Sequence, residues 1–297
     1  MQPFLIVFMT LATGILGRDV GFTGIPRFPF PDELTENERI VGGQPASIEN
    51  HGHQAALLLE QPNQSPRLRC GAGALSEHWA LSAAHCNIAN NVAGRLWLRV
   101  GSSYHAKDGQ LLEVENFMEH PEYVSFFLWN DIGLIKTKES IVFEGHVKAI
   151  YLEKRTPETD EWLEVCGWGR QIEADGNSIP DDLRMVQLQK SSDDDCRRTF
   201  GFADLLSQFC AGGPVEGDKG VCFGDSGSPI YSIRNGKQLA VGLVSGGYVC
   251  AGPRIPSIFT RLATFIPWIE NIIGKRVTYE DDGNEIVDDV LLPMIST

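Results

Sequence analysis

The sequence predicts an all-β fold, either a barrel or a sandwich, that ends in a single α-helix. Short apolar runs of strand length recur along the chain and are separated by turn residues. The clearest runs are 54–59, 96–100, 111–117, 132–136 and 239–245. Turn signals include the pairs Asp108-Gly109, Asp175-Gly176 and Asn235-Gly236. Only residues 263–273 carry apolar side chains at helical spacing, and Gly274 would end that helix.

The composition is that of a globular protein and argues against a nucleic-acid-binding class. The 297 residues are 42% hydrophobic and 22% charged, so the chain can bury a large core. A formal net charge of −14 and a pI near 4.9 are the opposite of the basic surface that a phosphate backbone attracts. We therefore expect no nucleic-acid partner.

The cysteines indicate an oxidising compartment. Seven cysteines stand at positions 70, 86, 166, 196, 210, 222 and 250, and none belongs to a Cys-x-x-Cys pair. This spacing argues against a zinc ribbon or a thioredoxin-type redox site. Widely spaced cysteines behind an apolar N-terminus predict disulfides in a secreted, extracellular protein. The odd count leaves one cysteine unpaired.

We interpret residues 1–17 as a signal peptide. Residues 3–16 form an apolar run that is short for a bilayer span, and small residues accompany its end. An N-terminal anchor helix is the alternative. No other segment of the sequence is long and apolar enough to span a membrane, so we expect no membrane partner and a soluble mature protein.

The segments on either side of the central domain have distinct compositions. Residues 18–39 lack periodicity and end in Arg39, directly before Ile40-Val41-Gly42-Gly43. A basic residue before an apolar, Gly-rich start is typical of a processing site, so 18–39 is interpreted as an activation propeptide. Its removal would free an α-amine on Ile40. Residues 275–297 are interpreted as a solvated acidic tail, with partner binding as the alternative.

One stretch suggests chemistry. Residues 221–229 read Val-Cys-Phe-Gly-Asp-Ser-Gly-Ser-Pro. The glycines on both sides of Asp225-Ser226 let the backbone turn sharply and bring amide groups close to a bound atom. Ser226 is a candidate nucleophile, and a serine hydroxyl then needs a base, a group that orients the base and donors for an oxyanion. By itself the stretch could equally be a Gly-rich surface turn.

The order of residues along the chain restricts the mechanism. All seven histidines precede Ser226, which excludes the α/β-hydrolase order. A subtilisin-type order would require an aspartate before His85, and the only ones lie in the removable segment. The order that remains is histidine, aspartate, serine. His85 follows an apolar run and precedes Cys86, and Asp131 begins an apolar strand, where a buried carboxylate needs a strong donor.

These residues resemble the chymotrypsin/trypsin-like serine proteases. The matching motifs are Ile40-Val41-Gly42-Gly43, Ser82-Ala83-Ala84-His85-Cys86, Asp131-Ile132-Gly133-Leu134, Gly167-Trp168-Gly169 and Gly224-Asp225-Ser226-Gly227. Each motif alone is weak, but together they stand in family order across residues 40 to about 273. The resemblance implies two six-stranded antiparallel β-barrels, with the site between them and a C-terminal α-helix. It also implies a trypsin-like serine protease domain over residues 40–274.

The resemblance implies a role for each candidate site residue. Ser226 would attack the scissile carbonyl, His85 would take its proton and pass it to the leaving amine, and Asp131 would hold the imidazole tautomer. The N–H groups of Gly224 and Ser226 would form the oxyanion hole. Ser245 matches the family serine that supports the aspartate. Taken separately, the alternatives are a packed histidine, a capping aspartate and a turn serine.

The same resemblance implies a zymogen and a disulfide pattern. After cleavage at Arg39, the ammonium of Ile40 would pair with Asp225 and shape the oxyanion hole. The implied disulfides are Cys70–Cys86, Cys196–Cys210 and Cys222–Cys250. Cys166 is left over as a buried free thiol, with an intermolecular disulfide as the alternative.

The resemblance also assigns a specificity pocket. Gly220, six residues before the nucleophile, would lie at its base, and Gly247 and Ser257 would form its walls beside Ser245. Without a carboxylate at the base, a substrate Lys or Arg would be costly to bury. We therefore predict chymotrypsin-like cleavage after Phe, Tyr, Leu or Met.

Three residues near the pocket depart from the family pattern. Gly246 stands where the family usually has tryptophan, which removes a wall for the preceding substrate residues. Ser228 replaces a usual glycine, and the sequence offers no reason for it. Phe223 places a bulky side chain at the pocket rim.

We predict no metal and no cofactor. Residues 102–110 lack the carboxylates of the family's calcium loop, and His51-Gly52-His53 has no third ligand nearby. Asn63-Gln64-Ser65 is a glycosylation sequon, although Pro66 follows it.

The expected partners are a protein or peptide substrate, an activating protease and protein protease inhibitors, and the protein is expected to be a monomer. The rival hypotheses are a non-catalytic serine-protease homologue that acts as a binding protein, and a protease of trypsin-like or elastase-like preference.

Overall fold

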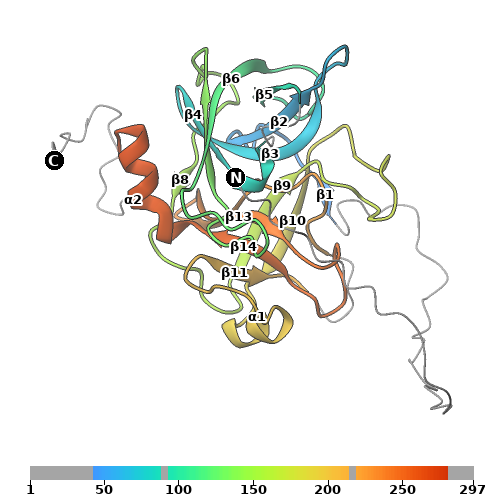
Figure 1. Cartoon of the computed structure of the whole chain (residues 1–297), viewed down its shortest axis with the longest axis vertical. Helices are drawn as coiled ribbons and strands as arrows, with labels where there is room; N and C mark the ends of the chain where they lie inside the picture. The colour runs from blue at the N-terminus through green and yellow to red at the C-terminus, as the bar shows by residue number, and fades with distance from the viewer. Residues whose placement is uncertain (1–42, 88–92, 214–218, 280–297) are drawn as a thin grey trace, which may run out of the picture. The chain divides into compact units, whose positions relative to one another are not determined.

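A computed structural model describes residues 43–87, 93–213 and 219–279 (Figure 1). The interpreted signal peptide, the propeptide and the Arg39-Ile40 processing site lie outside these residues. The tail from residue 280 onward also lies outside them. No helix in the described part of the chain is long and apolar enough to cross a membrane.

The first half of the described chain forms a closed β-barrel. Its strands pair antiparallel in the order β2-β3-β4-β7-β6-β5, and β5 pairs with β2 to complete the ring. The bounds are β2 Gln54–Glu60, β3 Arg67–Ser76, β4 Trp79–Ser82, β5 Arg95–Val100, β6 Gln110–Glu119 and β7 Gly133–Thr137. Apolar runs that the sequence marked as strands fall inside these elements, which confirms one of the two predicted barrels.

The second half, together with β1 from the start of the described chain, forms an eight-stranded sheet with the path β1-β10-β9-β12-β13-β14-β11, and β8 pairs parallel with β13. The bounds are β1 Gln44–Pro45, β8 Tyr151–Leu152, β9 Trp162–Gly167, β10 Arg184–Gln189, β11 Gln208–Ala211, β12 Pro229–Arg234, β13 Lys237–Gly246 and β14 Ser257–Arg261. The tight turn at Asn235-Gly236 joins β12 to β13, and both residues have positive φ as the turn signal predicts.

The second six-stranded barrel that the resemblance implied is not closed. Strands β10 and β11 meet only at an isolated bridge between Lys190 and Ala211. β1 pairs with the first residues of β10, Arg184 and Met185, whereas β11 meets β10 only at its other end. The prediction of two closed barrels is therefore corrected to one barrel and one open sheet.

The helices confirm one prediction and add an element that the sequence reading missed. α2, Leu262–Ile273, matches the predicted helix, and Gly274 ends it in the left-handed conformation. α1, Asp193–Thr199, was not predicted, because it buries only Cys196 and so shows no apolar stripe. Its signal is instead the cap: Oγ of Ser192 accepts a hydrogen bond from the N–H of Asp195.

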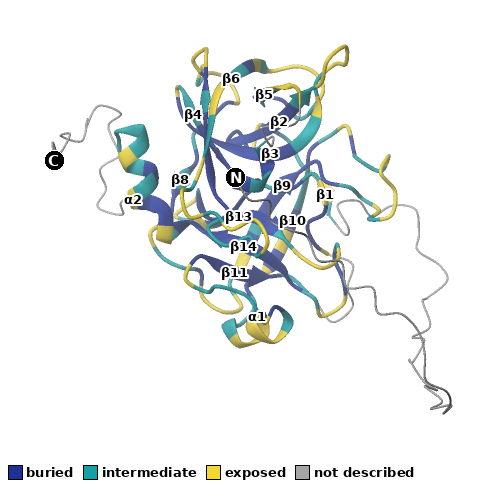
Figure 2. Cartoon of the chain, in the orientation of Figure 1, coloured by how far each residue is buried: buried dark blue, intermediate teal, exposed yellow. Residues whose placement is uncertain are grey.

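Buried residues lie in both halves of the fold (Figure 2). One apolar cluster fills the barrel and a second lies within the eight-stranded sheet. A third takes residues from both, including Leu81 of β4 and Leu243 of β13, and extends to Ile269 of α2. Burial on both sides holds the halves in a fixed relation, so side chains from each can build one site.

Candidate active site

His85, Ser226 and Gly224 line one cavity of about 450 Å³. They come from both halves of the fold. His85 lies on η1 (Ala84–Cys86), the short helix that follows β4, whereas Gly224 and Ser226 lie in the loop before β12. Asp131 completes the predicted set from the turn before β7 and is fully buried. The fold thus brings together the three predicted triad residues, which are 46 and more residues apart in sequence.

The carboxylate of Asp131 holds His85 at two points. Its Oδ2 lies 2.8 Å from Nδ1 of the imidazole, and its Oδ1 accepts the backbone N–H of His85 at 2.9 Å. Ser245 also donates to Oδ2, at 2.6 Å. These contacts fix the ring with its proton on Nδ1 and leave Nε2 to act as a base toward the cavity.

Oγ of Ser226 and Nε2 of His85 form no hydrogen bond to each other within the described residues, although both residues line the cavity. Such bonds between nucleophile and base are often long without substrate and tighten in the reactive complex. The main chain of Ser226 is fixed instead, because its carbonyl accepts a 2.7 Å hydrogen bond from the N–H of Gly71 on β3.

The loop around Ser226 depends on glycine. Gly224 and Gly227 have φ of 107° and 80°, a region that other residues rarely adopt. A Cβ on Gly227 would lie 2.1 Å from Oγ of Ser82. A side chain at either glycine would therefore strain or crowd the backbone beside Ser226.

The side chain of Asp225, which belongs to the same loop, is buried. Its Oδ1 accepts the N–H of Gly169 at 2.7 Å, and its Oδ2 accepts the N–H of Cys222 at 2.9 Å. Burial raises the pKa of Asp225 to about 6, while these two N–H donors act in the opposite direction. The Gly-Trp-Gly motif has a physical reason here, since a Cβ on Gly167 or Gly169 would lie 2.1 Å from a carboxylate oxygen of Asp225.

Three of the four predicted pocket residues line the cavity, and one does not. Ser245, Gly247 and Ser257 line the cavity, but Gly220 does not. Gly220 is buried behind the lining, and a Cβ there would lie 2.9 Å from Cα of Ala251. The neighbouring Val221 lines the cavity in its place. The lining therefore includes the apolar residue Val221 and not the glycine that was predicted at the base of the pocket.

Two of the three departures from the family pattern, Gly246 and Phe223, lie at the cavity. Gly246 leaves no open gap, because a Cβ there would lie 2.6 Å from Cδ1 of Leu128, which fills this space and lines the cavity. The loss of a wall for the preceding substrate residues stays a prediction. The ring of Phe223 is mostly exposed at the cavity, and the guanidinium carbon of Arg170 lies 5.2 Å from its centroid.

The disulfides join the pairs that the resemblance implied, Cys70–Cys86, Cys196–Cys210 and Cys222–Cys250. Cys166 is a buried free thiol, and burial raises its pKa. Its Sγ lies 3.3 Å from the hydroxyl of Tyr231, which in turn lies 2.9 Å from Nδ1 of His51.

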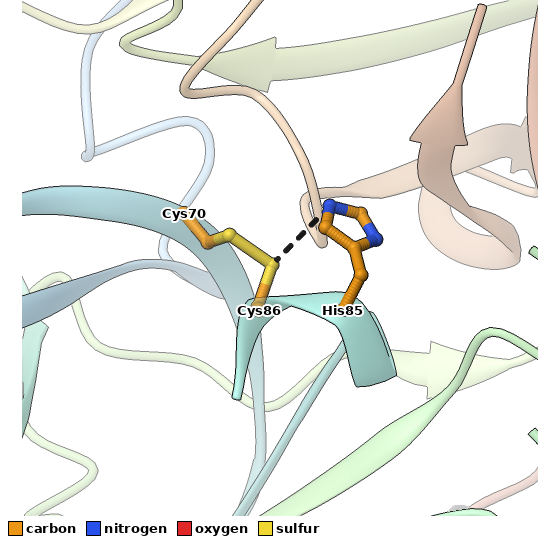
Figure 3. Close-up of side chains that lie close together, drawn as sticks. All are labelled: Cys70, His85 and Cys86. Carbon is orange, nitrogen blue, oxygen red and sulfur yellow. Dashed lines mark hydrogen bonds between the residues drawn. A yellow bond between two sulfur atoms is a disulfide. The ribbon is translucent and has the colours of Figure 1, made fainter. Parts of the chain in front are cut away.

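Figure 3 shows the imidazole of His85 beside the Cys70–Cys86 disulfide, with Nε2 3.8 Å from Sγ of Cys86. These three side chains are the one group of clustered metal-binding atoms within the described residues. Both sulfurs are held in the disulfide, and only a thiolate binds a metal well. The group therefore does not fit a metal ion.

Two supporting residues were not found from the sequence. Oγ1 of Thr260 on β14 donates to the backbone carbonyl of Asp131 at 2.7 Å. Nε2 of Gln54 on β2 donates to Oγ of Ser228 at 2.9 Å, which gives Ser228 a partner. The second contact spans 174 residues, and no local pattern signals it.

The chain is similar to known proteins over most of its length. The family model described as trypsin matches residues 40–269. Trypsin 5G1 of Aedes aegypti is 29% identical over 274 residues, 91% of this chain and 98% of that protein. Trypsin epsilon of Drosophila erecta is 33% identical over 78% of this chain and 86% of its own length. Trypsin-4 of Rattus norvegicus is 31% identical over 82% and 93%, respectively.

A histidine clamped by a buried carboxylate beside a serine in a glycine-bounded loop defines a serine peptidase. The chain belongs to the trypsin family and is a serine endopeptidase with three disulfides. Proteins or peptides are therefore its substrates.

Proposed function

We propose that this protein is a secreted endopeptidase, made as a zymogen, that cleaves peptide bonds with Ser226 as nucleophile, His85 as base and Asp131 as the group that orients the base. The observation that carries the proposal is the 2.8 Å contact between Nδ1 of His85 and the buried carboxylate of Asp131. It holds the imidazole with Nδ1 toward the carboxylate, so Nε2 is the ring nitrogen that is left to accept the proton of Ser226.

In the acylation step, Oγ of Ser226 bonds to the scissile carbonyl carbon while its proton passes to Nε2 of His85. The carbonyl oxygen becomes an oxyanion, which accepts hydrogen bonds from the N–H groups of Gly224 and Ser226. The C–N bond then breaks, and the imidazolium returns its proton to the leaving amine. A water molecule repeats the sequence and releases the acid, with the carboxylate of Asp131 stabilising the transient imidazolium.

The buried carboxylate of Asp225 supports the zymogen proposal. Burial raises the pKa of Asp225 to about 6, and no cationic side chain among the described residues forms an ion pair with it. Cleavage after Arg39 would create an ammonium on Ile40 that can pair with this carboxylate and so stabilise the loop around Ser226. The uncleaved chain is then expected to hydrolyse peptides far more slowly than the cleaved chain.

The primary specificity is proposed to be for large apolar side chains. Apolar residues contribute to the lining, among them Val221, Val244 and Val249. The buried position at Gly220 has no room for a carboxylate. A Phe, Tyr, Leu or Met side chain in this cavity gains burial energy of about 2 kcal/mol, whereas a Lys or Arg would be desolvated without a deep partner.

A trypsin-like preference is the second candidate, because one acidic residue, Glu173, is among those that line the cavity. Glu173 is partly exposed, on the same loop as Arg170. The relatives named trypsins add to this candidate. An elastase-like preference has less support, since Gly247 and Ser257 are small and leave the lining open.

The test uses protein cleaved at Arg39 and peptide substrates that differ only in the residue before the cut: Phe, Leu, Val and Lys. Fastest cleavage after Phe or Leu supports the apolar pocket. Fastest cleavage after Lys, lost in Glu173→Gln, would establish the second candidate. Ser226→Ala and His85→Ala, each correctly folded, should abolish turnover on every peptide; full activity in either would refute the assigned mechanism.

Secretion and the division of the chain into segments are also part of the proposal. Three disulfides and relatives that are trypsins suggest a secreted protease. We propose a signal peptide over 1–17, a propeptide over 18–39, a protease domain over 40–274 and an acidic tail over 275–297. The monomeric state, the activating protease and protein inhibitors as partners remain parts of this proposal. Mass spectrometry of the secreted protein would define both ends.

A further inference from the structure

Arg69 is tied to the turn that carries His85. It lies on β3 directly before Cys70, and its guanidinium is half-buried. Nε donates to the carbonyl of Cys86 at 2.5 Å, and Nη2 donates to the carbonyl of Asn87 at 2.8 Å. A longer contact of 3.4 Å joins Nη2 to the carbonyl of His85. One side chain therefore faces three consecutive carbonyl groups.

These carbonyls lie at the C-terminal end of the short helix η1 and at the residue that follows it. η1 has three residues, and its internal hydrogen bonds use only the carbonyls of Ala83 and Ala84. The last carbonyls of any helix need a donor from elsewhere, and a cation at the C-terminal end also complements the peptide dipoles. A guanidinium supplies several N–H donors in a fixed plane, so it suits adjacent carbonyls better than a flexible ammonium does.

Two attachments therefore hold His85 from opposite sides. Its backbone N–H is bound by Asp131 at 2.9 Å, and the carbonyls from its own onward are bound by Arg69. The Cys70–Cys86 disulfide joins the same two segments covalently (Figure 3). A disulfide constrains the separation of the two Cα atoms, but it leaves the orientation of the peptide planes to be set by hydrogen bonds.

We propose that Arg69 is a positioning residue for His85, acting through the main chain of residues 85–87. This inference rests on the proposed function, in which His85 is the base. The imidazole must reach Ser226 without losing Asp131, and small displacements of a reacting group cost large factors in rate. Arg69 fixes the end of η1, and so the direction in which the side chain of His85 leaves the backbone.

The competing role for Arg69 is substrate binding, because it also lines the cavity. A guanidinium there could attract an acidic substrate residue on the leaving-group side of the cut. The two roles differ in which kinetic constant they change. A positioning role lowers kcat for every substrate, whereas a binding role raises KM only for substrates that carry the acidic residue.

The experiment compares Arg69→Met and Arg69→Lys with the wild type and with Arg67→Met. The control removes the same charge from an exposed residue of the same strand. Two substrates are used: a peptide amide with residues on both sides of the cut, and a small activated ester with no residue after it. Thermal unfolding of each variant shows that the protein is folded at the assay temperature.

We expect Arg69→Met to lower kcat at least about tenfold on both substrates, with KM within about twofold of the wild type. Arg69→Lys should remain low, because one ammonium cannot serve adjacent carbonyls, and Arg67→Met should match the wild type. The proposal is overturned if folded Arg69→Met keeps its kcat, if only the KM of acidic peptides rises, or if lysine restores full activity. If one of these results is obtained while Ser226→Ala and His85→Ala are inactive, the role of Arg69 is overturned and the proposed function still stands.

If Arg69→Met is unfolded at the assay temperature, the decision passes to Arg69→Lys, which keeps the charge and the aliphatic stem. A folded Arg69→Lys enzyme with reduced kcat on the small ester supports positioning by the planar guanidinium. A folded Arg69→Lys enzyme with wild-type kcat contradicts it.

Discussion

Ser245 donates a 2.6 Å hydrogen bond to Oδ2 of Asp131, the same oxygen that faces Nδ1 of His85. The carboxylate is fully buried, so each of its hydrogen bonds is made in a medium of low dielectric constant and is worth more than in water. Ser245 lies on β13 of the open sheet, and Asp131 directly precedes β7 of the barrel. This hydrogen bond therefore also links the two halves of the fold.

Removing that donor should weaken catalysis without abolishing it. Ser245→Ala is expected to lower kcat/KM by roughly tenfold, because the carboxylate loses one of its fixed donors and orients the imidazole less tightly. Asp131→Asn should cost far more; about 10⁴-fold is the value for this change in the family's template protease. Steady-state kinetics on one peptide measures both. Equal losses in the two variants would contradict the supporting role of Ser245.

A carboxylate introduced at position 220 should not create a trypsin-like enzyme. A Cβ on Gly220 would lie 2.9 Å from Cα and 3.0 Å from N of Ala251, and these are backbone atoms that cannot move aside cheaply. Gly220→Asp is therefore expected to lower the midpoint of thermal unfolding and not to raise cleavage after Lys. Efficient cleavage after Lys by a fully stable Gly220→Asp enzyme would show that the base of the pocket is more open than this packing allows.

His53 should make the protein sensitive to acid. Burial lowers the pKa of His53 to about 3, with His51 adding to the effect, and its Nε2 has no hydrogen-bond partner within the described residues. The unfolded chain binds a proton near pH 6.5, and the folded chain does not. This contribution to stability is therefore present above that pH and is lost progressively as pH falls toward 3.

His53→Phe removes the titrating group and keeps an aromatic ring against Tyr231, whose centroid lies 5.0 Å away. Urea unfolding should show the variant gaining stability relative to the wild type at pH 4, by a few kcal/mol as an order of magnitude, with a smaller difference at pH 7.5. His146→Phe, at an exposed position, serves as the control. A difference between His53→Phe and the wild type that does not change with pH would contradict the assignment.

Ser228 should stabilise the fold through Gln54. Both side chains are fully buried, and Oγ of Ser228 occupies the space beside Gly71, where a Cβ would lie 1.9 Å from it. Ser228→Ala leaves Nε2 of Gln54 with only a 3.5 Å contact to the carbonyl of Ala55, so it should cost about 1–3 kcal/mol of unfolding free energy. Gln54→Met in the same protein should recover part of that loss, measured by urea unfolding. Additive losses in the double variant would mean that the two residues do not act as a pair.

The sequence by itself determined the chemistry and most of the regular structure. The order of His85, Asp131 and Ser226 along the chain excluded two other hydrolase arrangements, because chain order differs between folds that share the same triad. The apolar runs located four of the six barrel strands, β2, β5, β6 and β7, and the helical stripe located α2, since periodicity is a local property.

Only the tertiary structure decided the rest, because it depends on contacts between distant segments. The second sheet stays open because β10 and β11 meet only at one bridge, a long-range pairing that no strand pattern encodes. Gly220 lies behind the cavity because of where Ala251 packs, and Ser228 meets Gln54 across 174 residues. Periodicity reports which face of an element is buried, whereas the partner on that face is set by how the elements pack together.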